Sequence, residues 1–452
     1  MGLRPCVIAR RLAAALGFFV AAATHASAQE HTPLKLANAQ IVPLTWAALD
    51  GWTEDDQSAA FAALLKSCKA ILNGSKAMRA ARPIYAGLFD ICTRAGAAPP
   101  PEGGEQARIF FEQNFRPVRI SPLGESQGFF TGYYEPVVNG ARYPSAEYNV
   151  PLYRKPSNLA VSGARKHGKA FPNAGKVGRK FGRRKIVPYY DRTEIEEGIL
   201  AGRELEICWV KDPVDAFFAQ IQGSTRVKLD TGGMLRLNYE AHNGMPYTPV
   251  GKFLIERGIV SKEDMSMDRI REWMAANPEG GKELRRKNRS FVFFRETGLA
   301  EDEEPVGAQG IPLTTGRSIA VDKSIHVYGT PFWIEAELPI ASEKPETKFR
   351  RLTIAQDTGS AIVGPARADI YFGSGEEVGS IAGRIKQFGR FVMLVPGKLS
   401  AALATTNVPL PQPRPETIAG DEPKLAQHAD SPEETAAVPL PKPRPKSAPE
   451  RT

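Results

Sequence analysis

The sequence predicts a mainly β protein that opens with a short helical section. Beyond about Pro117, short runs rich in Val, Ile, Tyr and Phe are separated by Gly and Pro, a rhythm typical of a β barrel or sandwich. Before that point, apolar residues recur at helical spacing over 61–72 and 85–92. The 452-residue length and the 42% hydrophobic content indicate a globular chain of two or three domains.

The amino terminus has the features of a secretory signal peptide, which we place at residues 1–28. Three arginines precede the apolar run 12–23, and the small-residue triplet Ala-Ser-Ala follows it at 26–28. That run is too short to span a bilayer and no longer one follows, so no transmembrane segment is predicted. Loss of the three arginines lowers the net charge from +9 to +6. We therefore expect an exported, moderately basic protein whose partners are anionic but not nucleic acid.

The helical section carries two cysteines in positions that fit a disulfide. Cys68 and Cys92 lie near the ends of two consecutive helix-like stretches, and an oxidising compartment would allow a bond between them. Two buried thiols fit the same pattern. Cys208 lies inside the apolar run 205–210 and is expected in the core.

The strand-like section extends from about residue 117 to 396. Its clearest runs are GFFTGYY (128–134), TRVKL (225–229), FVFF (291–294) and FVMLV (391–395). One helical stretch interrupts them over 262–287, and Asn277-Pro278 and Gly280-Gly281 are expected to break it after Ala276.

Beyond Pro396 the chain changes character and is predicted to form a disordered tail over 398–452. The segment VPLPQPRP (408–415) recurs almost unchanged as VPLPKPRP (438–445). Such proline-rich segments favour polyproline II, which can dock a cell-wall protein partner or act as a passive spacer.

Several chemistries are excluded by missing motifs. The six His are scattered without ligand spacing, and neither a G-x-S-x-G elbow nor a phosphate loop occurs. We therefore predict no metal site and no cofactor.

Three aspartates stand out in the last third of the chain. Asp322, Asp357 and Asp369 each lie beside a short apolar segment in glycine-bounded sequence. An aspartate at such a strand end either forms a turn with its own backbone or acts as a catalytic carboxyl. A second unusual stretch, 129–136, combines paired aromatics with hydroxyls and a carboxylate, a composition that suits sugar rings and also suits a buried strand.

These stretches belong to a series of motifs that resembles the membrane-bound lytic murein transglycosylase A family, including its C-terminal three-aspartate domain. The resemblance extends from about Pro117 to Pro396. It rests on FTGYYEP (130–136), PLYRKP (151–156), RELEICWVKDPVDAFFAQIQGS (203–224), NGMPYTPVGKFL (243–254), NRSFVFF (288–294), VGAQGIPLTTGRSIAVD (306–322), AQDTGSAIVGPARADIYFG (355–373) and GRFVMLVP (389–396).

The resemblance implies a double-psi β-barrel domain built from both sides of a second, inserted β domain, with a glycan strand bound between the two. We accordingly divide the mature chain into N-terminal helices with the first part of the barrel (29–135), the inserted domain (136–295), the second part of the barrel with the three-aspartate domain (296–397), and the tail.

The implied activity is that of a lytic exotransglycosylase, which cleaves the β-1,4 bond between N-acetylmuramic acid and N-acetylglucosamine in peptidoglycan. The product ends in 1,6-anhydromuramic acid, and no water is consumed. One carboxyl then suffices, and the matching motif assigns the general acid/base to Asp369. A raised pKa would keep Asp369 protonated, and Asp357 is the expected catalytic neighbour.

Further residues are candidates for holding the acid's hydrogen-bond network or the sugar. They are Thr131, Tyr133, Tyr134, Glu135, Gln220, Gln222, Ser224, Arg226, Gln309 and Asp322. Two alternatives remain: a hydrolytic muramidase, for which Glu135 or Asp357 would be the second carboxylate, and a non-catalytic peptidoglycan-binding protein. Residue 29 is Gln where the family carries a lipid-anchor Cys, so we expect a periplasmic protein and leave outer-membrane association open.

Overall fold

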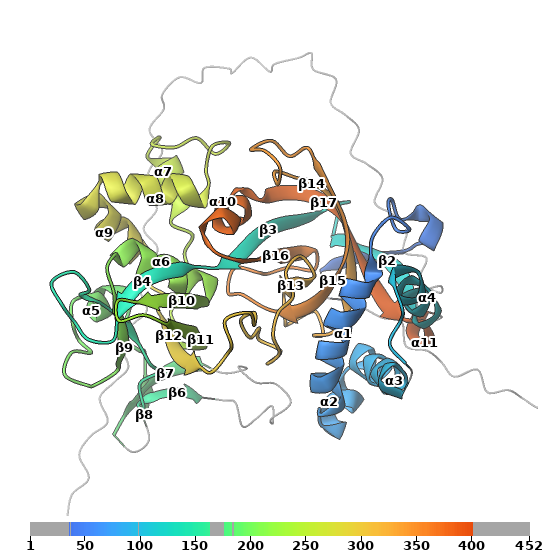
Figure 1. Ribbon diagram of the computed structural model, residues 1–452, viewed down its shortest axis with the longest axis horizontal. Helices are drawn as coiled ribbons and strands as arrows, with labels where there is room; N and C mark the ends of the chain where they lie inside the picture. Colours follow the sequence, from blue (N-terminus) through green and yellow to red (C-terminus); the bar gives the residue numbers. More distant parts are fainter. Residues whose placement is uncertain (1–35, 37, 98, 163–175, 183–184, 401–452) are drawn as a thin grey trace, which may run out of the picture. The chain divides into compact units, whose positions relative to one another are not determined.

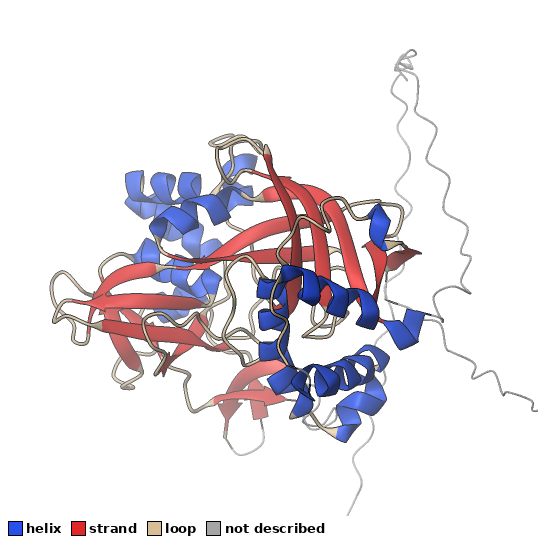
Figure 2. Ribbon diagram, turned by 45° about the vertical axis from the view of Figure 1, so that its right-hand side comes forward, coloured by secondary structure: helices blue, strands red, loops and turns tan. Residues whose placement is uncertain are grey.

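A computed structural model describes residues 36 and 38–400, apart from 98, 163–175 and 183–184. The predicted signal peptide and the proline-rich repeats lie outside the described residues. Strands dominate and form sheets of eight, six and three strands in this part of the chain (Figures 1 and 2). None of the helices described here combines the length and the apolar character needed to cross a membrane.

The N-terminal section is helical, as the periodicity predicts. After β1 (Ala39–Pro43) and a short 3-10 turn (Trp46–Ala48) come α1 (Gln57–Leu72), α2 (Lys76–Ala81), α3 (Pro83–Ala97) and α4 (Gly104–Asn114). Helix α1 begins where the Asp56 carboxylate accepts a hydrogen bond from the Ser58 amide. Its apolar side packs against α3 and α4.

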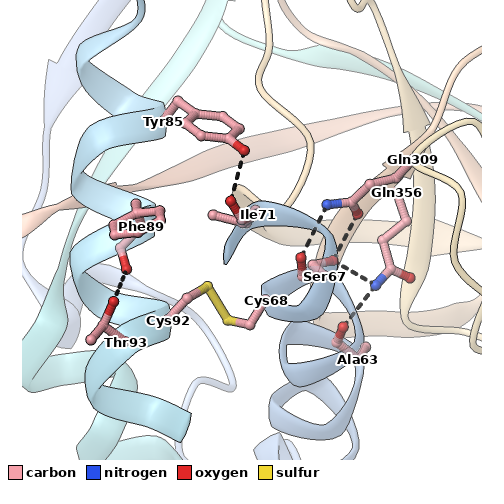
Figure 3. The surroundings of a disulfide bond; sticks show 10 residues. All are labelled: Ala63, Ser67, Cys68, Ile71, Tyr85, Phe89, Cys92, Thr93, Gln309 and Gln356. Carbon is pink, nitrogen blue, oxygen red and sulfur yellow. Dashed lines mark hydrogen bonds between the residues drawn. A yellow bond between two sulfur atoms is a disulfide. The ribbon is translucent and has the colours of Figure 1, made fainter. Parts of the chain in front are cut away.

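A disulfide joins Cys68 on α1 to Cys92 on α3 (Figure 3). The structure thus decides between the two alternatives that the sequence leaves open. The bond ties the helical hairpin together, and the chain between the two cysteines is closed into a loop that limits the freedom of the unfolded state.

Six strands close into a barrel. They are β3 (Gly128–Glu135), β13 (Ser318–Val321), β14 (Pro331–Leu338), β15 (Thr347–Asp357), β16 (Arg367–Ser374) and β17 (Lys386–Pro396). The order of pairing is β17-β14-β15-β13-β16-β3, and β3 pairs back onto β17 to complete the ring. Two pairs, β13 with β15 and β16 with β3, are parallel, and the other four are antiparallel.

The barrel interior is apolar, and its outer edge is extended by two more strands. Side chains that are fully buried inside include Phe130, Ile319, Phe332, Ile354 and Phe391. Strand β2 (Phe115–Pro122) pairs with β17, and β1 pairs with β2. The mainly β class with a closed barrel is therefore confirmed.

The second sheet is formed by the sequence between β3 and β13. Its order is β12 (Val292–Thr297), β11 (Met234–His242), β10 (Ser224–Leu229), β4 (Val137–Ala141), β9 (Glu206–Val210) and β5 (Val150–Tyr153). A small sheet of β6 (Leu159–Ser162), β7 (Lys176–Phe181) and β8 (Lys185–Val187) accompanies it. Cys208 is buried in the core of the larger sheet, as expected.

Helices line this second sheet and the barrel edge. They are α5 (Arg192–Glu196), α6 (Pro213–Gln222), α7 (Gly251–Glu256), α8 (Met267–Ala276), α9 (Pro278–Lys287), α10 (Glu376–Arg384) and α11 (Gly397–Ser400). Helix α10 packs against β3 and β16, and α8 contacts α10 (Figure 1).

The prediction that the helical stretch 262–287 breaks after Ala276 is partly right. Asn277-Pro278 does separate α8 from α9, because Pro278 starts the new helix. Gly280 and Gly281, however, lie inside α9. A Cβ atom at Gly281 would come within 3.0 Å of the Met274 carbonyl oxygen, so close packing of the two helices explains this glycine.

Candidate active site

A pocket of about 460 Å³ lies where barrel residues and residues of the second sheet meet. The barrel contributes Thr131 and Tyr133 from β3, Asp357 from the end of β15, and Asp369 from β16. Because β3 and β16 are parallel neighbours, Thr131 and Asp369 are register partners on adjacent strands. Strand pairing therefore brings together residues that are more than 200 positions apart in sequence.

Asp369 is held by a short chain of polar contacts. The Thr131 hydroxyl donates to Asp369 Oδ1 at 2.5 Å and accepts from the Arg367 guanidinium at 2.7 Å. The Asp369 side chain is half-buried and remains open to the pocket. Burial raises the pKa of Asp369, while the positive charge of Arg367 and the Thr131 hydrogen bond oppose that rise.

Asp357 has more hydrogen-bond donors than Asp369. Its Oδ1 accepts from the backbone amides of Ala308 and Thr358, both at 2.8 Å, and its Oδ2 accepts from the Tyr133 hydroxyl at 2.9 Å. The pKa of Asp357 is raised overall, because burial and the nearby charge of Asp369 raise it more than these three donors lower it. Donors of this kind stabilise the ionised carboxylate.

The second sheet supplies the other side of the pocket. Gln220 and Gln222 come from the end of α6, and both line the pocket. Gln220 Oε1 accepts from Arg192 at 2.8 Å, and Gln222 Oε1 accepts from the Tyr134 amide at 3.1 Å. Each oxygen thus has a partner in the protein, and the Gln222 amide nitrogen donates one hydrogen to Met267 Sδ at 3.3 Å, so its second N–H and the Gln220 amide nitrogen are the donors available to a ligand.

Arg192, Tyr247 and Arg367 are pocket residues that the sequence reasoning did not single out. Arg192 is 2% exposed, and its guanidinium also donates to the Asn288 and Ser290 carbonyls. Burial raises the pKa of Tyr247 to about 12, and the charge of Asp369 adds to that rise. Tyr247 and Arg367 lie within motifs NGMPYTPVGKFL and GPARADIYFG, so the motifs could have indicated them.

Two residues predicted for the sugar lie beside the pocket but outside its lining. The Tyr134 side chain contacts α10 at Gly379, and its hydroxyl lies 3.4 Å from Arg271. Glu135 is 0% exposed and forms ion pairs with Arg226 at 2.7 Å and Arg236 at 3.0 Å. Arg226 is thereby engaged as well, and the three residues link the end of β3 to β10 and β11.

Three more predicted residues are separate from the pocket lining. Ser224 is buried at the start of β10. Gln309 exchanges hydrogen bonds with Ser67 on α1 (Figure 3). Asp322 accepts from the Ser324 and Gly364 amides, which lower its pKa and fit the turn-forming interpretation. Within the described residues, no group of three or more His, Cys, Asp or Glu could hold a metal ion.

The fold and the pocket define a barrel protein with an inserted second sheet and a carboxyl-based site, the chemistry commonly used to cleave glycosidic bonds. Residues 129–295 match the MltA specific insert domain, and residues 317–395 match the 3D domain. The chain belongs to the membrane-bound lytic murein transglycosylase A family.

Named relatives and solved structures agree with this membership. The chain is 35% identical over 275 residues to membrane-bound lytic murein transglycosylase A of Vibrio cholerae, and 34% identical over 269 residues to that of Escherichia coli K12. Each match covers 59% of this chain and 66% or 65% of the relative, just under two thirds of its length.

A crystal structure of the membrane-bound lytic murein transglycosylase from Agrobacterium tumefaciens superposes with a TM-score of 0.70 at 34% identity, and covers 80% of this chain and 99% of that one. The crystal structure of Escherichia coli MltA with bound chitohexaose superposes with a TM-score of 0.54 at 26% identity. This match covers 81% of this chain and 95% of that one.

Proposed function

We propose that this protein is a periplasmic lytic transglycosylase that cleaves the β-1,4 bond between N-acetylmuramic acid and N-acetylglucosamine in peptidoglycan and leaves 1,6-anhydromuramic ends. The observation that carries the proposal is the unequal setting of two carboxyls in one pocket, Asp369 and Asp357. The names of the relatives, and the chitohexaose bound to one of them, support a glycan as the ligand.

The two carboxyls are suited to different protonation states. Asp357 receives three hydrogen bonds, two of them from backbone amides that can only donate, so it is the better stabilised carboxylate. Burial raises the pKa of both carboxyls, but Asp369 receives one hydrogen bond, from Thr131. We therefore place the proton on Asp369, the carboxyl with fewer donors to stabilise its ionised form.

Cleavage then needs only this one acid. Asp369 gives its proton to the glycosidic oxygen as the bond from that oxygen to the anomeric carbon of muramic acid breaks. The Asp369 carboxylate next accepts the proton of the muramic C6 hydroxyl, while the C6 oxygen bonds to the anomeric carbon. The acid is restored, one bond is broken, one is formed, and no water enters.

Thr131 and Arg367 stabilise Asp369 between these two steps. Once Asp369 has lost its proton, the Thr131 hydroxyl donates to it and the Arg367 charge lies close by. The contacts are in place before the reaction, so little rearrangement is needed when charge develops. Tyr133 acts on Asp357 in the same way.

We assign sugar binding to the predicted residues that line the pocket. Gln220 and Gln222 offer amide donors to N-acetyl or hydroxyl oxygens, and Gly132 and Ile385 provide apolar wall. The predicted residues outside the lining hold the surrounding structure. Glu135 joins β3 to the second sheet, Gln309 joins its loop to α1, and Asp322 holds a turn.

A hydrolytic muramidase is the second candidate, since Asp357 lies in the same pocket and could activate water. Glu135 is unsuited to that task because it forms ion pairs with two arginines and does not line the pocket. Mass analysis of the products released from purified sacculi separates the possibilities. Products lighter by one water molecule than reducing-end muropeptides are expected. Reducing-end products would assign a hydrolase, and no products would favour a binding protein.

A further inference from the structure

A second cavity of about 460 Å³ lies in the inserted region, next to the pocket that holds Asp369. The two cavities share Arg192 and Gln220 in their linings. The hydrogen bond between these side chains thus forms a common wall. The second cavity is otherwise lined by α5, α6 and α9, with Tyr153, Phe217 and Phe291 providing its apolar surface.

The cationic residues of this cavity outnumber its acids. Lys282, Arg285 and Arg286 come from one side of α9, spaced three and four residues apart, and Arg192 comes from α5. Glu196 and Glu197 are the acids in the lining. Both are already paired with Arg286, at 3.3 Å and 3.0 Å, and Glu196 also lies 3.5 Å from Arg192.

Arg285 is the unusual member of this group. It is 7% exposed, yet its guanidinium has no hydrogen bond and no ion pair with any described residue, and its Nε is buried without a partner. The charges of Glu196 and Asp212 interact favourably with the Arg285 guanidinium but form no ion pair with it, and the charge of the neighbouring Arg286 is repulsive. A buried charge without a partner is strongly destabilising, so its retention needs an explanation.

The helix dipole does not explain it. Cations in the last turn of a helix interact favourably with the terminal carbonyls, but they do so at the surface. Lys287 in the same turn is such a surface cation: it is exposed and forms an ion pair with Glu283. Arg285 instead lines a cavity large enough for a ligand, together with Lys282, which is exposed and forms no ion pair among the described residues.

We propose that this cavity binds a carboxylate of the peptide stem that peptidoglycan carries on muramic acid. The inference rests on the proposed function, because in peptide-bearing glycan the lactyl carboxyl of muramic acid is an amide, so the sugars are neutral and the stem carboxylates are the anionic groups nearest the cleaved bond. A guanidinium binds a carboxylate through two parallel hydrogen bonds, and Lys282 adds a second positive charge at the rim. The shared wall places this site next to the sugar pocket.

The direct test is binding of stem peptides released from sacculi by an amidase. The full chain is titrated calorimetrically as wild type, Arg285→Met, Lys282→Ala and the control Lys287→Ala, which removes a charge from the same helix outside the cavity. Arg285→Met should weaken binding at least about tenfold and Lys282→Ala several-fold, with Lys287→Ala unchanged. Peptides with esterified carboxyls should not bind the wild type.

Three outcomes would overturn the proposal. The first is equal affinity of the wild type and Arg285→Met for the peptide. The second is equal affinity of free and esterified peptide. The third is displacement of the peptide by acetate at matching concentration, which would assign the cavity to small anions in general.

A folding control accompanies the titration. Arg285→Met should melt at or above the wild-type Tm in the absence of ligand, because it removes an unpaired buried charge. A large fall in Tm would mean that Arg285 is needed for the fold itself, and would count against a ligand site.

Kinetic measurements on two substrates test whether the cavity takes part in substrate binding. Arg285→Met should raise KM for peptide-bearing glycan strands and leave kcat unchanged. It should leave cleavage of amidase-stripped strands unchanged, because these keep only the lactyl carboxylate and lack the stem carboxylates. Failure of the wild type to cleave either substrate would contradict the proposed function, while the binding titration would still decide the fate of the cavity proposal.

Discussion

Two carboxyls in the described part of this molecule, Glu135 and Asp369, differ in how positive charge reaches them. At the junction of β3 with the second sheet, Glu135 contacts two guanidiniums directly. In the pocket, Asp369 contacts a hydroxyl, and Arg367 reaches it only through that hydroxyl. Burial raises the pKa of both groups, but Glu135 is part of a charge cluster, whereas Asp369 is the group that exchanges a proton in the proposed mechanism. We infer that direct pairing with arginine serves structure at Glu135, and that the indirect contact leaves Asp369 free to carry the proposed proton.

The largest effect expected from this contrast is on catalysis. Asp369→Asn should lower the rate of muropeptide release about a thousandfold, because it removes the proton donor and leaves binding contacts in place. The rate is measured on purified sacculi. Glu135→Asp, which keeps the charge at the junction, is the matched control and should retain most activity in the properly folded fraction. Near-normal activity of Asp369→Asn would remove it from the catalytic role.

The next effect is on stability. Glu135→Gln leaves Arg226 and Arg236 without their shared carboxylate, and should lower the free energy of unfolding by about 3 kcal/mol. Chemical denaturation measures the loss. The pH at which the activity of the folded protein falls on the alkaline side should not change. A stable Glu135→Gln protein in which that pH shifts would place Glu135 in the catalytic site.

The disulfide in the N-terminal helical section should contribute on a similar scale. The paired change Cys68→Ser and Cys92→Ser should cost about 3 kcal/mol, since it frees the loop between the two helices in the unfolded state. Denaturation of the double variant, compared with the wild type under reducing and oxidising conditions, measures this loss. The two proteins should become equal once the wild type is reduced.

A smaller effect concerns the stability that is lost when the Asp369 carboxyl ionises in the folded protein. The folded pKa of Asp369 lies above the ordinary value of 3.8, so the protonated form is favoured in the fold. The resulting stability is fully present below pH 3.8 and is lost as the pH rises through the raised pKa. Asp369→Asn should therefore raise Tm modestly at neutral pH, and this gain should vanish in acid. A fall in Tm at neutral pH would contradict the raised pKa.

The smallest effect is a shift in pH dependence. Thr131→Val removes a donor that lowers the pKa of Asp369, so that pKa should rise. The alkaline limb of kcat/KM then moves to higher pH by about one unit or less. Thr358→Val is the matched control, because the Thr358 hydroxyl donates to the Val321 carbonyl and does not contact Asp369. Equal profiles for the two variants would contradict the role of Thr131.

The barrel and the pair of pocket aspartates were predictable because they lie in long local motifs. Strand patterns around Phe130 and Phe391 indicated the β class, and the motifs around Asp357 and Asp369 indicated the two carboxyls that the pocket brings together. The separation of Tyr133 from Tyr134 was also within reach, since neighbouring residues of a strand point to opposite faces. Gly280 and Gly281 were misjudged because a helix-breaking residue can be required by a packed neighbour, which local sequence does not reveal.

Arg192 and Arg285 could not be found from sequence in the same way. Both are arginines among many in the chain, and their distinction lies in burial and in the partners that they have or lack. Glu135 shows the converse case. It belongs to the most conspicuous motif, yet its contacts are structural ion pairs that only the folding of β10 and β11 around it creates.

The most direct test of the central claim is digestion of sacculi in water labelled with heavy oxygen. If Asp369 acts alone and the C6 hydroxyl of muramic acid is the nucleophile, the released ends carry no label and are lighter by one water than reducing ends. Label at the anomeric carbon of the products would show that water attacks there, and would contradict the account of a single acid/base.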